Sequence, residues 1–141
     1  MGRLMAIDYG RKRCGIAVTD SLRIVATGLP TVATSGLIPF VKEYVGRESV
    51  DAIIVGYPRD MKGNDSESMR YIRPGIERLK RELPQMEIIF WDERFTSVIA
   101  HQGMIDAGMS KSQRRDKGLA DEMAAVIILN SYLESRNYNS K

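Results

Sequence analysis

Three apolar segments near the start of the chain are joined by links that are too short to contain a helix. The segments cover residues 4–7, 14–18 and 24–34, with turn-forming residues at 10–12 and 20–23 between them. A crossover between parallel strands needs about a dozen residues or more, whereas a tight turn is enough to join antiparallel strands. We therefore predict three β-strands that pair antiparallel in chain order.

After residue 36 the apolar spacing changes to a helical period, which predicts a helix over 37–47. The remaining pattern predicts a strand over 52–55, a helix over 64–83, a strand over 87–91, a helix over 96–107 and a buried helix over 119–133. Pro74 argues against an unbroken second helix. This order predicts an α/β fold with one mixed sheet, in which the antiparallel three-strand start is followed by a βαβ-type finish.

The composition limits the chemistry that is available. The chain has 141 residues, 43% of them hydrophobic, and a formal charge of +3, so we expect one domain, residues 1–141, with a sizeable core. The mild positive charge is compatible with nucleic acid and with many other enzymes. Cys14 is the only cysteine and His101 the only histidine. This argues against disulfides and zinc, and leaves hard cations held by carboxylates.

The sequence shows no sign of a membrane or secretion segment. No stretch approaches the roughly 20 apolar residues of a membrane span. The N-terminus also lacks a basic stretch followed by a long apolar run. We therefore expect a cytoplasmic protein that does not bind membranes.

Acidic residues occur where a sheet-based fold would gather them. Asp8 ends the first strand, and Asp92 and Glu93 follow the fifth. If these strands are parallel neighbours, Asp8 and Glu93 emerge at the same edge of the sheet. Asp121, in the first turn of the last helix, reaches the same place if that helix packs across the edge. Converging carboxylates repel one another unless a cation such as Mg²⁺ neutralises them.

Each acid also has a structural interpretation, and spacing alone leaves both open. Asp8 fits an Asx-type turn at a strand end. Asp92 and Glu93 fit a solvated loop. Asp121 fits the N-terminal end of a helix dipole. Asp116 is a rival to Asp121, which we prefer because it precedes a rigid apolar helix.

Four motifs in series resemble those of the YqgF/RuvX family, described as pre-16S rRNA nucleases and earlier as Holliday junction resolvases. They are AIDYG with RCGIAV (6–10 and 13–18), VGYP with MKG (55–58 and 61–63), DERFTS (92–97) and DEMAAVIIL (121–129). The resemblance implies an RNase H-like fold with a five-stranded mixed sheet flanked by helices. It also implies that Asp8, Glu93 and Asp121 form the catalytic centre and bind Mg²⁺ or Mn²⁺.

Two positions depart from the family's usual pattern. Ser97 stands where a second threonine is frequent, and Tyr57 where leucine is frequent. Neither departure removes an acid or a glycine of a motif, so the implied catalytic centre is unaffected.

Basic residues accompany these motifs. Gly10 allows a tight turn that carries Arg11, Lys12 and Arg13. Four cations lie within residues 111–117, just before the last helix, where they suit a flexible arm on a phosphate backbone or, alternatively, a solvated loop. The residues expected to contact nucleic acid are Arg11, Arg13, Arg94, Thr96, Lys111, Arg114 and Arg115.

The sequence supports one leading function and three alternatives. The leading hypothesis is a metal-dependent endonuclease that processes the 5′ end of precursor 16S rRNA, with ribosomal particles as further partners, acting as a monomer or weak homodimer. An A-form RNA helix is recognised largely by shape, so no base-reading motif is expected. The alternatives are a Holliday junction resolvase on branched DNA, an actin-like phosphatase or kinase, and a non-catalytic nucleic-acid or ribosome-assembly binder. The actin-like alternative is disfavoured because no second glycine-rich phosphate loop is found.

Overall fold

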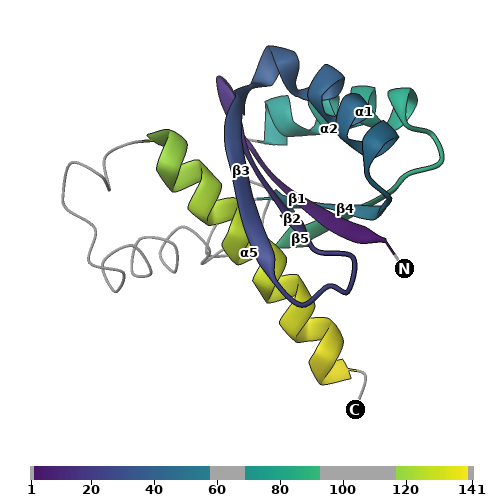
Figure 1. Ribbon diagram of the computed structural model, residues 1–141. Helices are drawn as coiled ribbons and strands as arrows, with labels where there is room; N and C mark the ends of the chain where they lie inside the picture. Colours follow the sequence, from purple (N-terminus) through teal and green to yellow (C-terminus); the bar gives the residue numbers. More distant parts are fainter. Residues whose placement is uncertain (1, 58–68, 93–116, 140–141) are drawn as a thin grey trace.

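The computed structural model describes residues 2–57, 69–92 and 117–139, and the side chains of 2–57, 69–91 and 123–134. Its centre is a five-stranded sheet with the order β3-β2-β1-β4-β5 (Figure 1). The strands are β1 (Arg3–Tyr9), β2 (Arg13–Thr19), β3 (Ala26–Ala33), β4 (Val50–Tyr57) and β5 (Glu87–Asp92). The first three pair antiparallel, whereas β4 pairs parallel with both β1 and β5. The predicted mixed sheet is therefore confirmed.

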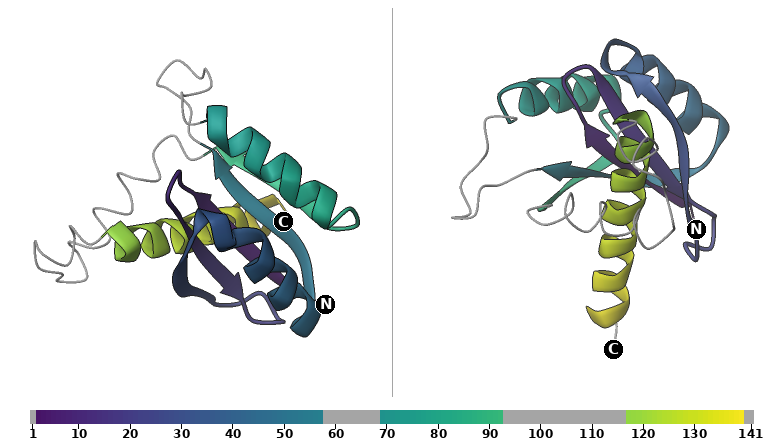
Figure 2. Two further views of the ribbon diagram at one scale, coloured as in Figure 1. Left: turned by 90° about the horizontal axis from the view of Figure 1, so that it is seen from above. Right: turned by 90° about the vertical axis from the view of Figure 1, so that its left-hand side faces the viewer.

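Helices cover both faces of this sheet. Helices α1 (Leu37–Arg47) and α2 (Met69–Glu82) lie on one face, and α5 (Lys117–Asn139) crosses the other (Figure 2). The predicted bounds of α1 are confirmed. The predicted helix over 64–83 is confirmed over Met69–Glu82, where it continues through Pro74 without a break. Its predicted beginning and the predicted helix over 96–107 lie outside the described residues. None of the helices in the described ranges is long and apolar enough to cross a membrane.

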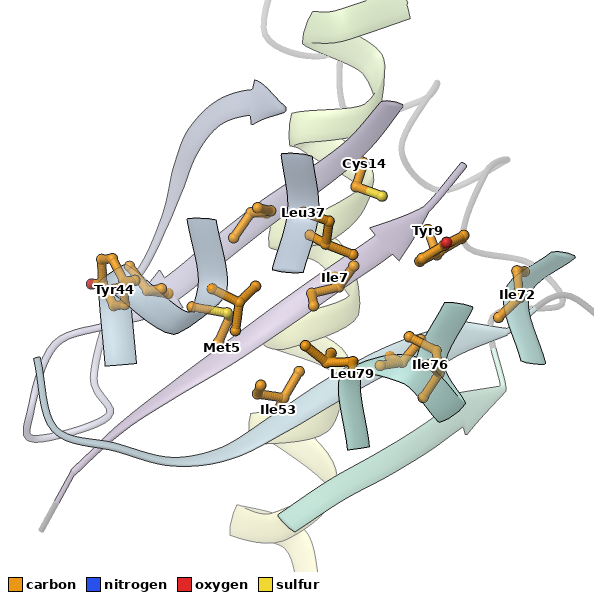
Figure 3. Packing of buried hydrophobic residues seen from close by; sticks show 14 of the residues in the cluster. Met5, Ile7, Tyr9, Cys14, Leu37, Tyr44, Ile53, Ile72, Ile76 and Leu79 are labelled. Atoms are coloured by element: carbon orange, nitrogen blue, oxygen red, sulfur yellow. The ribbon is translucent and has the colours of Figure 1, made fainter. Parts of the chain in front are cut away.

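The sheet separates two apolar layers because successive strand side chains point to opposite faces. Met5, Ile7 and Tyr9 of β1 pack with the residues of α1 and α2 (Figure 3). Leu4 and Ala6 pack on the opposite face, against α5. This alternation places Asp8 on the face that α5 covers and its neighbour Tyr9 on the face of α1 and α2.

The α5 layer is built largely from small strand residues. Ala6, Ala17 and Ala52 of three adjacent strands are buried beneath Ala125 and Ile128 of the helix. Small side chains let the helix axis approach the sheet closely, which favours dense packing of the two layers. The helix that carries Asp121 therefore rests directly on the strands that surround Asp8.

The third strand begins later than its sequence pattern predicts. Ile24 and Val25 lie before β3 and are 70% and 58% exposed. The cause is Asp20, whose carboxylate accepts the backbone N–H groups of both residues at 2.8 and 2.9 Å. These amides are used within the turn and are not available to a strand partner. The prediction of a strand from residue 24 was therefore wrong by two residues.

Candidate active site

The C-terminal ends of three parallel strands lie level at one edge of the sheet. Asp8 of β1 pairs with Gly56 of β4, and Gly56 pairs in turn with Trp91 of β5. Neighbouring strands lie about 4.8 Å apart, so the end of β5 is about 10 Å from Asp8. The expected parallel arrangement of these three strands is confirmed, and it brings Asp92, the last residue of β5, to the edge that holds Asp8.

Asp8 has a glycine beside it on each neighbouring strand. Its register partners are Gly15 of β2 and Gly56 of β4. Residues in register share a face of the sheet, so neither neighbour places a side chain directly beside the half-buried Asp8. Glycine in a strand often marks the close approach of a ligand. Sequence reasoning missed this pair, because the two glycines are 41 residues apart and only the strand register brings them together.

The other predicted members of the acidic centre are described in part or not at all. Asp92 is the last residue of β5 and pairs with Tyr57. Glu93 lies outside the described residues. Asp121 belongs to α5, which begins at Lys117, so it lies in the second helical turn and not in the first. The dipole effect fades within the first turn, which weakens the structural interpretation of Asp121.

The cations of the β1–β2 turn lie at the same edge as Asp8. Arg11 and Lys12 are exposed and Arg13 is half-buried. A Cβ atom on Gly10 would collide with the carbonyl oxygen of Arg13, so the turn requires glycine there. Thr34, directly after β3, anchors the turn: its hydroxyl donates to the Gly10 carbonyl at 2.7 Å, and its amide donates to the Lys12 carbonyl at 3.0 Å. The other predicted nucleic-acid contacts, Arg94, Thr96, Lys111, Arg114 and Arg115, lie outside the described residues.

One of the predicted ligands of a divalent cation has a described side chain at this edge. The parts of the chain with described side chains contain no group of three acids, cysteines or histidines that could hold a metal. Of the three predicted ligands, only Asp8 has a described side chain. A carboxylate is the ligand type that Mg²⁺ and Mn²⁺ prefer, and the residues in register with Asp8 on both neighbouring strands are glycines.

Trp91 shows how α5 is held next to this edge. Its indole N–H donates to the Ser131 hydroxyl at 3.2 Å, and its ring meets Tyr132 edge to face at 5.5 Å. The half-buried Trp91 therefore packs against α5 as part of the apolar layer on that face.

Comparison with solved structures defines the fold class. RuvC from Thermus thermophilus in complex with a Holliday junction substrate has a TM-score of 0.56, with 13% sequence identity. The match covers 96% of this chain and 98% of RuvC. A second structure of the same protein gives a TM-score of 0.55. The fold is therefore RNase H-like, as the motifs imply.

Sequence comparison then gives the family. The chain belongs to the RuvX family, whose model is described as Holliday junction resolvase and matches residues 2–135. A protein of Phocaeicola vulgatus, named "Putative pre-16S rRNA nuclease", is 52% identical over 98% of this chain and 99% of its own length. A protein of the same name from Porphyromonas gingivalis is 52% identical over 96% and 98%. The expected enzyme class, a nuclease, is confirmed.

Proposed function

We propose that this protein is a metal-dependent endonuclease, with residues 1–141 as one nuclease domain, that hydrolyses phosphodiester bonds in the 5′ region of precursor 16S rRNA. The observation that carries the proposal is the position of Asp8, between two glycines at the shared C-terminal edge of β1, β4 and β5. Ligand sites of α/β proteins form at this edge. The names of the curated relatives support the substrate.

The proposed centre combines three carboxylates with flanking cations. Asp8, Glu93 and Asp121 would hold one or two Mg²⁺ or Mn²⁺ ions. Such an ion, when bound, lowers the pKa of water and stabilises the charge that develops on phosphate oxygens. The carboxylate of Asp8 fixes the position of this charge on the rigid end of β1. Gly15 and Gly56 admit the phosphodiester alongside it.

The cations of the protein hold the substrate backbone in the proposed complex. Arg11 and Arg13 of the β1–β2 turn reach phosphates next to the reacting one. The further contacts that we propose come from Arg94, Thr96, Lys111, Arg114 and Arg115. Phosphate contacts of this kind fix the register of the nucleic acid and carry no sequence information.

A second candidate is cleavage of four-way DNA junctions, favoured by the description of the family model. The chemistry would be the same, but symmetric cutting of two strands requires a dimer with two-fold symmetry. The two functions differ in substrate and in assembly, and both differences can be measured.

A paired cleavage assay tests these functions. One arm offers a labelled 5′ segment of precursor 16S rRNA and the other a four-way DNA junction, each with Mg²⁺ or Mn²⁺. We expect cleavage of the RNA, reduced at least about a hundredfold in Asp8→Asn, because losing the charge of a metal ligand costs several kcal/mol in the transition state. Glu43→Gln changes an exposed acid on α1 and serves as the matched control. Symmetric cutting of the junction alone would favour the resolvase, and binding without cleavage of either would contradict both.

A further inference from the structure

Arg11, a cation of the β1–β2 turn, lies against an aromatic ring of helix α2. It follows Asp8 by three residues and its side chain is exposed. Its guanidinium carbon is 5.3 Å from the centroid of the Tyr71 ring. A cation within about 6 Å of an aromatic face is attracted by the quadrupole of the ring. The contact therefore favours one direction for a long side chain that solvent would otherwise leave free.

The backbone that carries Arg11 is held separately from this contact. The hydroxyl of Thr34 donates to the carbonyl of Gly10, and the amide of Thr34 donates to the carbonyl of Lys12. The two carbonyls belong to the residues directly before and after Arg11. The side chain thus starts from a fixed point, and its direction depends on its own rotamers and on Tyr71.

The Tyr71 ring is held in turn by packing at the end of β1. It stacks on Tyr9, with ring centroids 6.3 Å apart and an interplanar angle of 30°. Tyr9 is buried on the face of α1 and α2 (Figure 3). Arg78 donates a hydrogen bond to the Tyr9 oxygen, and a Cβ atom on Gly75 would overlap the Tyr9 hydroxyl. Glycine is a poor residue for a helix interior, so this contact explains its place in α2.

The kind of contact matters for the charge of Arg11. Elsewhere in the described structure, Arg23 pairs with Asp51 at 2.6 Å and Arg3 pairs with Glu48 at 3.4 Å. A carboxylate neutralises a guanidinium and uses its N–H donors. A tyrosine ring carries no net charge at neutral pH, so it can orient the guanidinium without neutralising it.

We propose that Tyr71 is a positioning residue, which holds the Arg11 guanidinium in the orientation that binds a substrate phosphate next to the reacting one. A side chain that is ordered before binding loses less entropy when the substrate arrives. The inference rests on the proposed function in taking nucleic acid as the ligand. It goes beyond that function by giving α2, through Tyr71, a part in substrate binding.

A double-mutant cycle tests the proposal. Fluorescence anisotropy with the 5′ segment of precursor 16S rRNA is measured on the full chain carrying Asp8→Asn, which prevents cleavage. We expect Arg11→Gln to weaken binding roughly tenfold, because a charge-assisted contact is lost. Tyr71→Leu should weaken it about threefold, and should cause no further loss when Arg11→Gln is already present. Additive losses, or an Arg11→Gln variant with unchanged affinity, would overturn the proposal.

Conservative and matched variants separate positioning from loss of charge. Tyr71→Phe keeps the ring and should bind as the parent does. Arg11→Gln should lower the slope of log affinity against log salt by roughly 0.7–0.9, whereas Tyr71→Leu should keep the slope, because the charge remains. A Tyr71→Phe loss as large as that of Tyr71→Leu would contradict a role of the ring.

Arg47 provides the control for the arginine. Its guanidinium carbon is also 5.3 Å from the centroid of a tyrosine ring, that of Tyr44. It ends α1 shortly before β4 begins, and therefore lies at the edge of the sheet opposite to Asp8. Arg47→Gln should leave the affinity unchanged. A loss equal to that of Arg11→Gln would reduce the effect to overall charge and overturn the proposal.

The contact itself can be measured in the wild type, without any variant. Nuclear Overhauser effects are expected between the side-chain protons of Arg11 and the ring protons of Tyr71. Their absence would overturn the proposal. In the cleavage assay, Tyr71→Leu in the otherwise wild-type chain should raise KM and leave kcat unchanged, because the phosphate held by Arg11 is not the reacting one. A loss confined to kcat would contradict this assignment.

The result can be separated from that of the proposed function. Coupled losses in Arg11→Gln and Tyr71→Leu, in a protein that cuts neither substrate, would contradict the nuclease and leave the positioning role standing. Cleavage that is lost in Asp8→Asn, together with additive effects of the two substitutions on binding, would do the reverse.

Discussion

Acids lie near both ends of strand β1, and the groups around them differ between the two ends. Near the N-terminal end, Asp20 accepts three backbone N–H groups of the β2–β3 turn, and Asp51 accepts the amide of Gly2 and the guanidinium of Arg23. Asp8, at the C-terminal end, lies between two glycines. All three are aspartates next to apolar strands. The residue type is the same in all three cases, so it does not decide the role of the acid. The comparison shows that strand register and the neighbouring backbone decide whether an acid holds a turn together or is placed to bind a ligand.

Gly56→Ala should have the largest effect in this comparison, because it places a methyl group in register with Asp8. A displacement of about 1 Å at a reacting centre can cost a hundredfold in rate, so we expect cleavage to slow at least about tenfold. Single-turnover cleavage of the precursor rRNA segment measures this. Gly46→Ala, with no described atom near its added Cβ, should behave as wild type. A folded Gly56→Ala variant with the normal rate would show that open space beside Asp8 is irrelevant.

Gly75→Ala should destabilise the protein by about 1–3 kcal/mol, because the added methyl group overlaps the Tyr9 hydroxyl within a packed region. Urea unfolding gives the free energy. The same substitution at Gly46, also within a helix, should stabilise by about 0.5–1 kcal/mol, since alanine is the better helix former and nothing obstructs it. Equal effects at the two positions would mean that α2 does not rest on Tyr9.

Asp20→Ala should lower the thermal midpoint by less than Gly75→Ala does and should leave the cleavage rate unchanged. The substitution removes the acceptor of three turn amides, which are exposed and can bond to water instead. A thermal scan and the cleavage assay on the same sample test both parts. A loss of activity at normal stability would contradict the division of roles between Asp20 and Asp8.

The smallest effect concerns stability in acid. Hydrogen bonds from the backbone of Val25 and Ile24 lower the pKa of Asp20 below its ordinary value of 3.8. The Gly2 amide and Arg23 lower the pKa of Asp51 in the same direction. The ionised carboxylates therefore stabilise the fold above that ordinary value, and this contribution is lost as the pH falls through the lower folded-state pKa.

Thermal midpoints below about pH 5 test this linkage. The Asp20→Asn/Asp51→Asn variant should lose less stability than wild type as the pH falls to about 2, because the two groups no longer take up protons. Parallel curves for wild type and variant would show that these carboxylates are not held in their ionised form by the turn.

Local periodicity predicted most of the fold, and the exceptions arise from side chains that act on the backbone. The apolar spacing gives the bounds of α1 and the order of the strands and helices that are described. It placed Ile24 and Val25 in a strand because it could not show that Asp20 binds their amides. It also overstated the effect of Pro74 on the continuity of the helix, because α2 accommodates this residue on its exposed side.

The candidate site was predictable only in part. Asp8 could be chosen because it ends an apolar strand within a recognisable motif. The significance of Gly15 and Gly56 depends on strand register, which a linear pattern does not contain. The roles of Glu93 and Asp121 stay predictions.

Binding of Mn²⁺ to the wild type, Asp8→Asn and Asp51→Asn tests most directly whether Asp8 belongs to a metal centre. Isothermal titration calorimetry measures the affinity without any nucleic acid. We predict that Asp8→Asn binds Mn²⁺ at least about tenfold more weakly than wild type, since the ion loses a charged oxygen ligand. Asp51→Asn, in which a structural acid is changed, should bind as wild type does. Equal affinity in the wild type and Asp8→Asn would contradict the assignment of Asp8 to the metal centre.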